Sequence, residues 1–131
     1  MSNNFDSVKK VTLTAGNQGM AGAPVLHLVL LVDQDDGSVT GKGVITQAVA
    51  PPGGVQAVSN ITGQVRALGF GPATQVLMLK GVIISTLPPP AIGTIEAPFS
   101  AYFVTDNDWV GKGGFDYGPR KIADVPVRPS E

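Results

Sequence analysis

Val39-Thr40-Gly41-Lys42-Gly43-Val44 places two glycines inside a segment that otherwise has the composition of a β-strand. The same arrangement recurs in Ile61-Thr62-Gly63-Gln64-Val65 and in Leu77-Met78-Leu79-Lys80-Gly81-Val82. Glycine weakens the interior of a strand, so its recurrence there usually marks a bulge, a bend or a barrel corner. These three segments therefore predict a small, strongly curved antiparallel sheet or barrel.

The rest of the chain repeats the alternation of strand and turn. Asp36-Gly37 is a hairpin turn by composition, because glycine accepts the positive φ that such turns require. No segment carries an apolar stripe at helical spacing, and seventeen glycines and eleven prolines argue further against helices. The fold class is predicted to be all-β, an antiparallel β-barrel or barrel-like sandwich of about seven or eight strands. Strands are expected at residues 8–14, 25–33, 39–49, 56–70, 74–85 and 92–105, with a last short hairpin from Trp109-Val110 to Phe115–Tyr117.

Period-two alternation assigns faces to these strands. In the strand at 74–85, Leu77, Leu79 and Ile83 share one side, whereas Met78 and Val82 lie on the other. The strand at 25–33 is apolar almost throughout, which predicts burial on both faces or a partner over the second face. The core is expected to contain the following residues: Val11, Leu13, Leu28, Leu30, Ile45, Ile61, Leu68, Leu77, Leu79, Ile83, Phe99, Phe103 and Trp109.

Length and composition predict one soluble domain. The chain has 131 residues, of which 43% are hydrophobic and 15% charged. Residues 1–7 are expected to be a flexible N-terminus, 8–118 a single β domain and 119–131 a flexible tail. Nine basic against ten acidic residues give a net charge of −1, which argues against nucleic-acid binding. The absence of cysteine excludes disulfides and thiolate chemistry.

Targeting signals are also missing from the sequence. The first ten residues do not resemble a signal peptide, and the longest apolar run, residues 25–32, is far shorter than a membrane span. We expect no membrane span and a cytoplasmic location by default, while export without a cleaved signal remains open. We expect no cofactor.

The candidate metal site is the acidic turn of Asp33, Asp35 and Asp36. Hard cations bind clustered carboxylates, and a calcium loop places acids at alternate positions before a glycine. Here the spacing is one residue short and no glutamate stands at the bidentate position. A solvated hairpin turn is the favoured interpretation, with a cation site as the alternative.

Five side chains are candidates for ligand binding. His27 is the sole histidine and shares an apolar strand face, where a structural role is more common than a catalytic one. Arg66 and Glu96 are charged residues in otherwise apolar strands. If they point inward, they line a cavity inside the barrel; if they point outward, they belong to the polar face of their strands. Trp109 and Tyr117 could bind a ligand if exposed, or plug the barrel end if buried. No catalytic residues are predicted.

Thr40-Gly41-Lys42-Gly43, Thr62-Gly63-Gln64 and the segment from Trp109 to Tyr117 resemble a family of small bacterial proteins known as domain of unknown function 1842. The resemblance covers nearly the whole chain. It implies a bacterial source and no known activity, so it carries over no catalytic residues.

Three functions remain open from the sequence. The leading hypothesis is a non-enzymatic binding or protein-interaction module, because no nucleophile, base or metal ligands cluster in the sequence. Such a module could form homo-oligomers through its edge strands. The alternative is a carrier or barrel enzyme for a small apolar ligand held inside the barrel. A surface-exposed or secreted antigen is the third.

Overall fold

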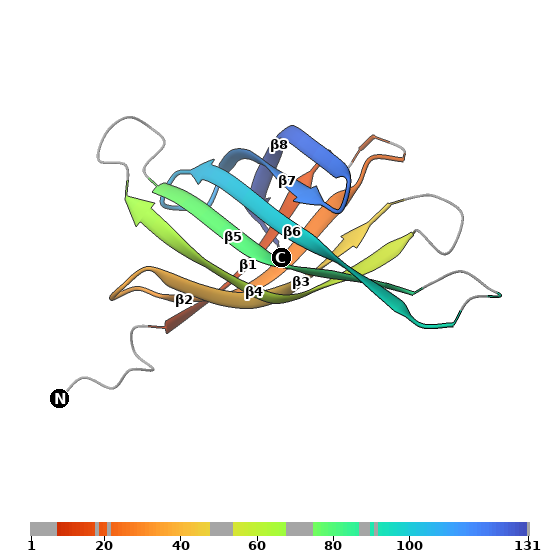
Figure 1. Ribbon diagram of the computed structural model, residues 1–131. Coiled ribbons are helices and arrows are strands. Elements are labelled where there is room, and N and C mark those ends of the chain that lie inside the picture. The colour runs from red at the N-terminus through yellow and green to blue at the C-terminus, as the bar shows by residue number, and fades with distance from the viewer. Residues whose placement is uncertain are drawn as a thin grey trace.

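A computed structural model describes residues 8–17, 19–20, 22–47, 54–67, 75–86, 90 and 92–130 (Figure 1). The predicted all-β class is confirmed: eight strands are present and the described residues contain no helix, hence none able to cross a membrane. The strands are β1 (Val8–Gly16), β2 (Val25–Asp33), β3 (Ser38–Thr46), β4 (Val55–Ala67), β5 (Gln75–Thr86), β6 (Thr94–Thr105), β7 (Gly111–Tyr117) and β8 (Arg120–Pro129).

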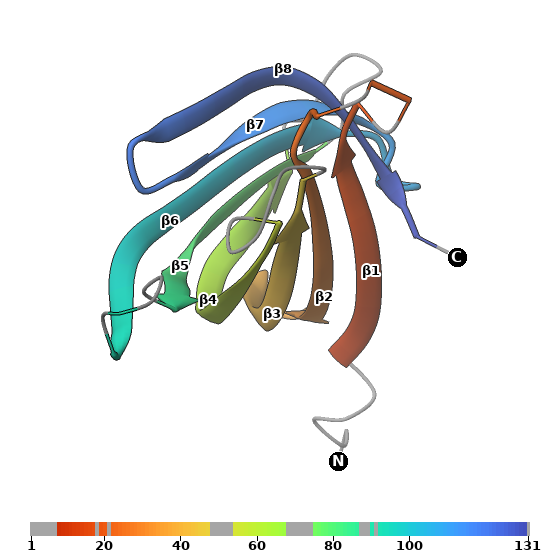
Figure 2. The same ribbon diagram turned by 90° about the vertical axis from the view of Figure 1, so that its right-hand side faces the viewer.

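The strands form a closed barrel in which each pairs antiparallel with the next, and β8 returns to β1. The pairing is uneven around the barrel. All 12 residues of β5 have a partner in β6, whereas β8 meets β1 at only Leu13↔Pro129, Thr14↔Arg128 and Ala15↔Val127. Figure 2 shows the β7–β8 hairpin arching over one side, with only the last part of β8 approaching β1.

The glycines within strands lie where neighbouring strands approach each other closely. The register between β3 and β4 shifts between Gly41 and Gly43, where two steps along β3 match three along β4. The extra residue of this bulge therefore lies on β4, where Asn60 has a φ of 55°. A Cβ at Gly41 would overlap the carbonyl oxygen of Val29 on the neighbouring strand, and a Cβ at Gly63 would overlap that of Met78. Neighbouring strands can therefore coil tightly here only because no side chain intervenes.

The barrel interior is an apolar core to which every strand contributes. Of the thirteen predicted core residues, eleven are buried, Trp109 is half-buried against the core, and Leu68 lies outside the described residues. The alternation in β5 is confirmed, since Leu77, Leu79 and Ile83 are buried. In β2 only one face is buried: Leu31, on the other face, is 49% exposed.

The prediction of a flexible tail after residue 118 is wrong. Residues 120–129 form β8, which pairs with β7 and places Val125 and Val127 in the core. Pro126 and Pro129 interrupt the apolar alternation and made the segment resemble a linker. Proline is tolerated here because β8 lies at the sparsely paired seam with β1. Residues 1–7, predicted to be flexible, lie outside the described residues.

The predicted hairpin within 109–117 is also wrong. Residues 111–117 are one strand, β7, which pairs with β6 on one side and β8 on the other. The turn comes earlier, because the Asp106 carboxylate accepts hydrogen bonds from the backbone N–H groups of Asp108 and Val110 at 2.9 and 3.1 Å. Trp109 closes this turn with a φ of 64°.

Candidate functional site

Three of the predicted ligand-binding side chains lie on the outside of the barrel. His27 is half-buried on the outer face of β2, where its Nε2 is 3.4 Å from Oγ1 of Thr46. Arg66 on β4 and Glu96 on β6 are exposed. Because these positions alternate with buried ones, the polar-face interpretation holds for both charged residues, and none of the three faces the interior.

The two aromatic candidates lie at opposite ends of the barrel. Tyr117 is buried and stacks on Phe115 with ring centroids 5.9 Å apart, while the Arg120 guanidinium lies 5.8 Å from its ring centroid. Burial raises the pKa of the Tyr117 phenol above its usual value of 10.0, with a smaller opposing effect from Arg120. Trp109 sits in the β6–β7 turn, so the two rings do not form one site.

Two carboxylates of the acidic turn accept hydrogen bonds from the backbone of the turn itself. The Asp33 carboxylate accepts a hydrogen bond from the Asp35 backbone N–H at 2.9 Å, and the Asp36 carboxylate accepts one from that of Ser38 at 2.8 Å. The Ser38 bonds lower the pKa of Asp36. Nowhere in the described ranges do three potential metal ligands gather. These carboxylates shape the β2–β3 turn, whose Gly37 has a φ of 76°.

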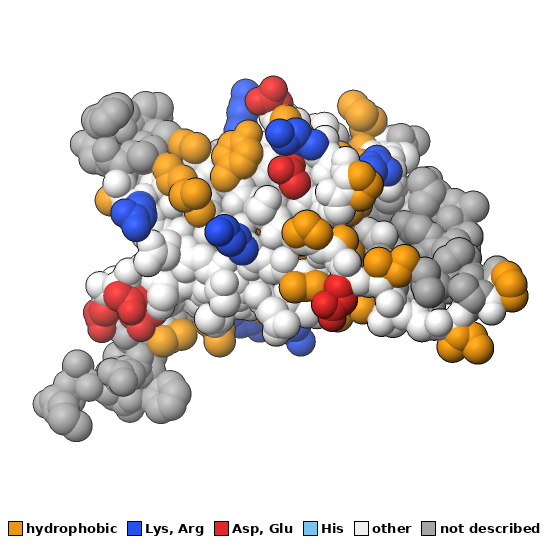
Figure 3. Space-filling model, viewed as in Figure 1, with side chains coloured by type: hydrophobic (Ala, Val, Ile, Leu, Met, Phe, Trp, Pro, Cys, Tyr) orange, Lys and Arg blue, Asp and Glu red, His pale blue; other side chains and the backbone are white. Residues whose placement is uncertain are grey.

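The structure brings a different set of residues together on the outer face of β4, β5 and β6. They line a hollow of about 860 Å³, here called the β4–β6 groove. Figure 3 shows hydrophobic side chains beside Lys and Arg side chains on this side of the molecule. The lining residues are Thr62, Gly63, Gln64, Arg66, Met78, Leu79, Lys80, Ser100, Ala101 and Tyr102.

One row of the sheet forms the centre of the groove. Gln64, Met78 and Tyr102 are register partners on three adjacent strands. Met78 is 57% exposed and Tyr102 50% exposed, although both lie in the middle of paired strands. The Tyr102 ring lies over Gly114 of β7, where a Cβ would come within 3.4 Å of the ring. Because Gly114 has no side chain, β7 leaves room for the Tyr102 ring on that side of the groove.

Two cations border this row. The Arg66 Nε and Nη2 donate hydrogen bonds of 3.3 and 2.9 Å to Oε1 of Gln64, so the guanidinium folds back over the row. Lys80 follows Met78 by two residues and therefore faces the same side. Throughout the described residues, neither Arg66 nor Lys80 makes an ion pair with an acidic side chain. The groove is thus apolar at its centre and cationic at its border.

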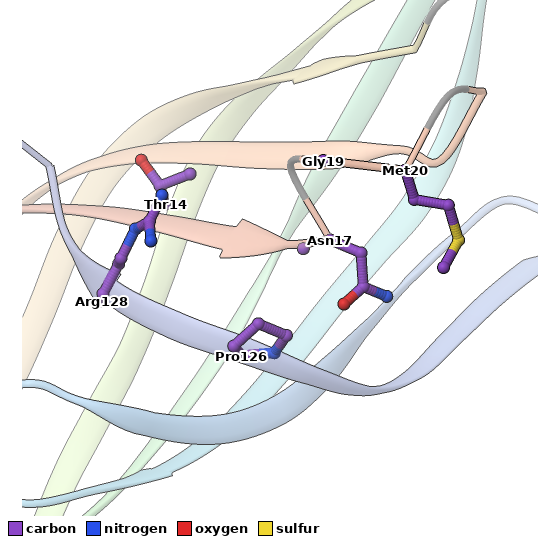
Figure 4. A pocket seen from close by; sticks show the side chains of 7 residues that line it. Thr14, Asn17, Gly19, Met20, Pro126 and Arg128 are labelled. Carbon is purple, nitrogen blue, oxygen red and sulfur yellow. The ribbon is translucent and has the colours of Figure 1, made fainter.

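A second hollow lies at the seam between β1 and β8 and has a volume of about 610 Å³. Figure 4 shows Arg128 beside Thr14 at one end, with Asn17 and Met20 toward the other. The Thr14 hydroxyl is hydrogen-bonded to that of Ser130, and the Ser130 N–H donates to the Thr12 carbonyl at 2.8 Å. We call this hollow the seam groove. Its lining residues are Thr14, Gly16, Asn17, Gly19, Met20, Pro126 and Arg128.

A family model matches residues 8–121, which is most of the chain and covers β1 to β7 entirely. The chain belongs to the family described as Domain of unknown function (DUF1842). A search of curated proteins found no match to the chain. The β4–β6 groove of this DUF1842 chain falls wholly inside the matched region, whereas Pro126 and Arg128 of the seam groove fall outside it. The bacterial source that the resemblance implies stays a prediction.

Sequence reasoning found only Arg66 among the residues that define the β4–β6 groove. It placed Met78 on the side of its strand opposite the core, which is where the structure has it. The signal that could have indicated the groove was a methionine on the predicted outer face of its strand, two residues from a lysine. Tyr102 is next to the predicted core residue Phe103, so alternation placed it on the outer face as well, but nothing in the sequence joined it to Met78.

Proposed function

We propose that this DUF1842 chain is a non-enzymatic binding module that docks a partner protein in the β4–β6 groove. The observation that carries the proposal is the half-exposed pair Met78 and Tyr102 between Arg66 and Lys80, two cations without an ion-pair partner among the described residues. Tyr, Met and Arg are among the side chains enriched at protein interfaces, because they combine large contact area with directional or adaptable contacts.

The groove also has the rigidity that a docking surface requires. It lies on β5, the strand whose 12 residues are all paired with β6, and the side chains beneath it belong to the core. Sites built on paired strands hold their side chains more accurately than sites built on loops. A partner would therefore meet a largely preformed surface and would lose little free energy in ordering it.

Edge pairing, which the sequence suggested as a route to homo-oligomers, has less support. The part of β8 that has no partner in β1 contains Lys121, Pro126 and a bulge at Asp124, whose φ is 55°. Lysine, proline and bulges are the features by which natural sheets resist edge-to-edge association. A face of the sheet is thus a better candidate for docking than this edge.

An apolar ligand inside the barrel also has less support than the groove. Phe99, Phe103 and Phe115 are at most 2% exposed and fill the interior together with aliphatic side chains from every strand. The polar residues that would have lined a ligand cavity, His27, Arg66 and Glu96, all lie outside. A lipocalin-like use of the interior would require this core to be displaced.

A peptide-display selection tests the proposal. Peptides selected on the immobilised protein are expected to bind Tyr102→Ala at least about tenfold more weakly than the unmodified chain, since an interface tyrosine commonly contributes that much. Leu31→Ala is the matched control: Leu31 is 49% exposed on the outer face of β2 and lies outside the groove. Circular dichroism checks that both variants fold. Peptides that bind Tyr102→Ala as tightly as the unmodified chain would contradict the proposal.

A further inference from the structure

The β4–β6 groove has a charge pattern that specifies its occupant more narrowly. The Arg66 guanidinium is positioned by Gln64 at one end of the row that continues through Met78 to Tyr102. Lys80 is separated from Met78 by two residues, which places the two side chains roughly 7 Å apart along the strand. Lys80 is therefore a near neighbour of the exposed methionine, and the Arg66 guanidinium lies against Gln64, the register partner of Met78.

Among the described residues, no acidic side chain forms an ion pair with Arg66 or Lys80. Two acidic residues lie near the groove. Asp36 directly precedes Gly37, whose carbonyl accepts a hydrogen bond from the N–H of Val65 next to Arg66, and Asp116 pairs with Ser100 of β6 and with Lys121 of β8. Ser100 thus stands between Asp116 and Lys80 in the sheet. Arg66 uses two of its five N–H donors on Gln64 and has no carboxylate partner in the described part of the chain.

An arginine held in this way is suited to a carboxylate. Its planar fork matches the two oxygens of a carboxylate, and hydrogen bonds between such charged groups are about twice as strong as neutral ones. The side chains of Met78 and Tyr102 next to it provide an adaptable apolar surface. A ligand that matches both features carries a carboxylate and an apolar group close together.

We infer that the partner presents a peptide segment in which an Asp or Glu side chain lies next to a large apolar side chain, the carboxylate binding Arg66 and the apolar group contacting Met78 and Tyr102. This inference rests on the proposed function. Single-stranded nucleic acid is a weaker match, because it binds rows of stacking aromatics in strongly basic grooves. This groove offers one aromatic ring, on a chain whose net charge is −1.

Neutralising the acids of groove-binding peptides tests the inference. Among peptides whose binding is lost in Tyr102→Ala, replacement of Asp or Glu by Asn or Gln is expected to weaken binding about tenfold. The same replacement is expected to have little effect on binding to Arg66→Gln, so that the two changes form a double-mutant cycle. Lys42→Gln, which removes an exposed cation from β3 outside the groove, is the control and should respond as the unmodified chain does.

The possible outcomes distinguish failure of the acidic-peptide inference from failure of the proposal that the β4–β6 groove docks a partner. Peptides that depend on Tyr102 but tolerate loss of their acids would overturn the inference alone. Peptides indifferent to Tyr102 would overturn both. An oligothymidine of about twelve nucleotides that displaces the peptides, and that loses affinity in Arg66→Gln, would replace the acidic peptide by nucleic acid as the occupant.

Discussion

The two grooves of this barrel lie on regions whose strands are paired very differently. The β4–β6 groove lies on the part of the sheet where the 12 residues of β5 are all paired with β6. The seam groove lies where β1 and β8 share three residue pairs and where Pro126 cannot donate a ladder hydrogen bond. A curved sheet can thus close into a barrel and yet concentrate its rigidity on one side, which is the side suited to a preformed docking surface.

Removing the core under the β4–β6 groove should have the largest effect. Phe103 is 0% exposed on the inner face of β6, next in sequence to Tyr102. Phe103→Ala is expected to lower the free energy of unfolding by about 3–5 kcal/mol, because it removes buried apolar area and leaves a cavity. Urea unfolding of the variant and of the unmodified chain measures this difference. A change at the seam, Val127→Ala, removes less buried volume and should cost clearly less; an equal or larger loss would show that the seam contributes as much to stability as the sheet under the groove.

Changes in the hydrogen bonds of the seam should have a smaller effect. Thr14→Val and Ser130→Ala each remove one partner of the hydroxyl pair that joins β1 to the end of β8. Each variant is expected to lose about 1 kcal/mol of stability. Amide hydrogen exchange should become faster in β1 and β8 while that of β5 and β6 changes little. Exchange that rises equally in all strands would show that the seam and the sheet open as one unit.

Tyr117→Phe should have the smallest effect at neutral pH. The phenol is buried and its pKa is raised, so the folded state holds the phenolic proton more tightly than the unfolded chain does. The resulting stabilisation is present below the unfolded pKa of 10.0 and is lost as the pH rises from there through the folded pKa. Between pH 8 and about 11, stability should therefore fall less in Tyr117→Phe than in the unmodified chain. An equal decrease in the free energy of unfolding of the two proteins, measured by urea unfolding over this pH range, would refute the prediction.

Much of the fold could be predicted because alternation and turn chemistry are local. Gly41, Gly43 and Asp36-Gly37 act on their immediate neighbours, and the strands around them were placed correctly. The segment at 120–129 was missed because its pairing is with β7, so that strand formation is decided by a tertiary contact and not by its own composition.

The candidate site was less predictable, since it depends on register. Gln64, Met78 and Tyr102 are separated by 14 and 24 positions and become neighbours only through the pairing of three strands. Alternation places each on an outer face but does not place them in one row. The approach of Arg66 to Gln64 depends in addition on a side-chain conformation.

The footprint of a selected peptide on the whole protein, measured by amide hydrogen exchange with and without the peptide, tests the central claim most directly. We predict added protection in β4, β5 and β6, centred on residues 62–66, 76–80 and 100–102, with no change at residues 14–17 or 126–128. Protection confined to β1 and β8 would place the docking surface at the seam and would contradict the account.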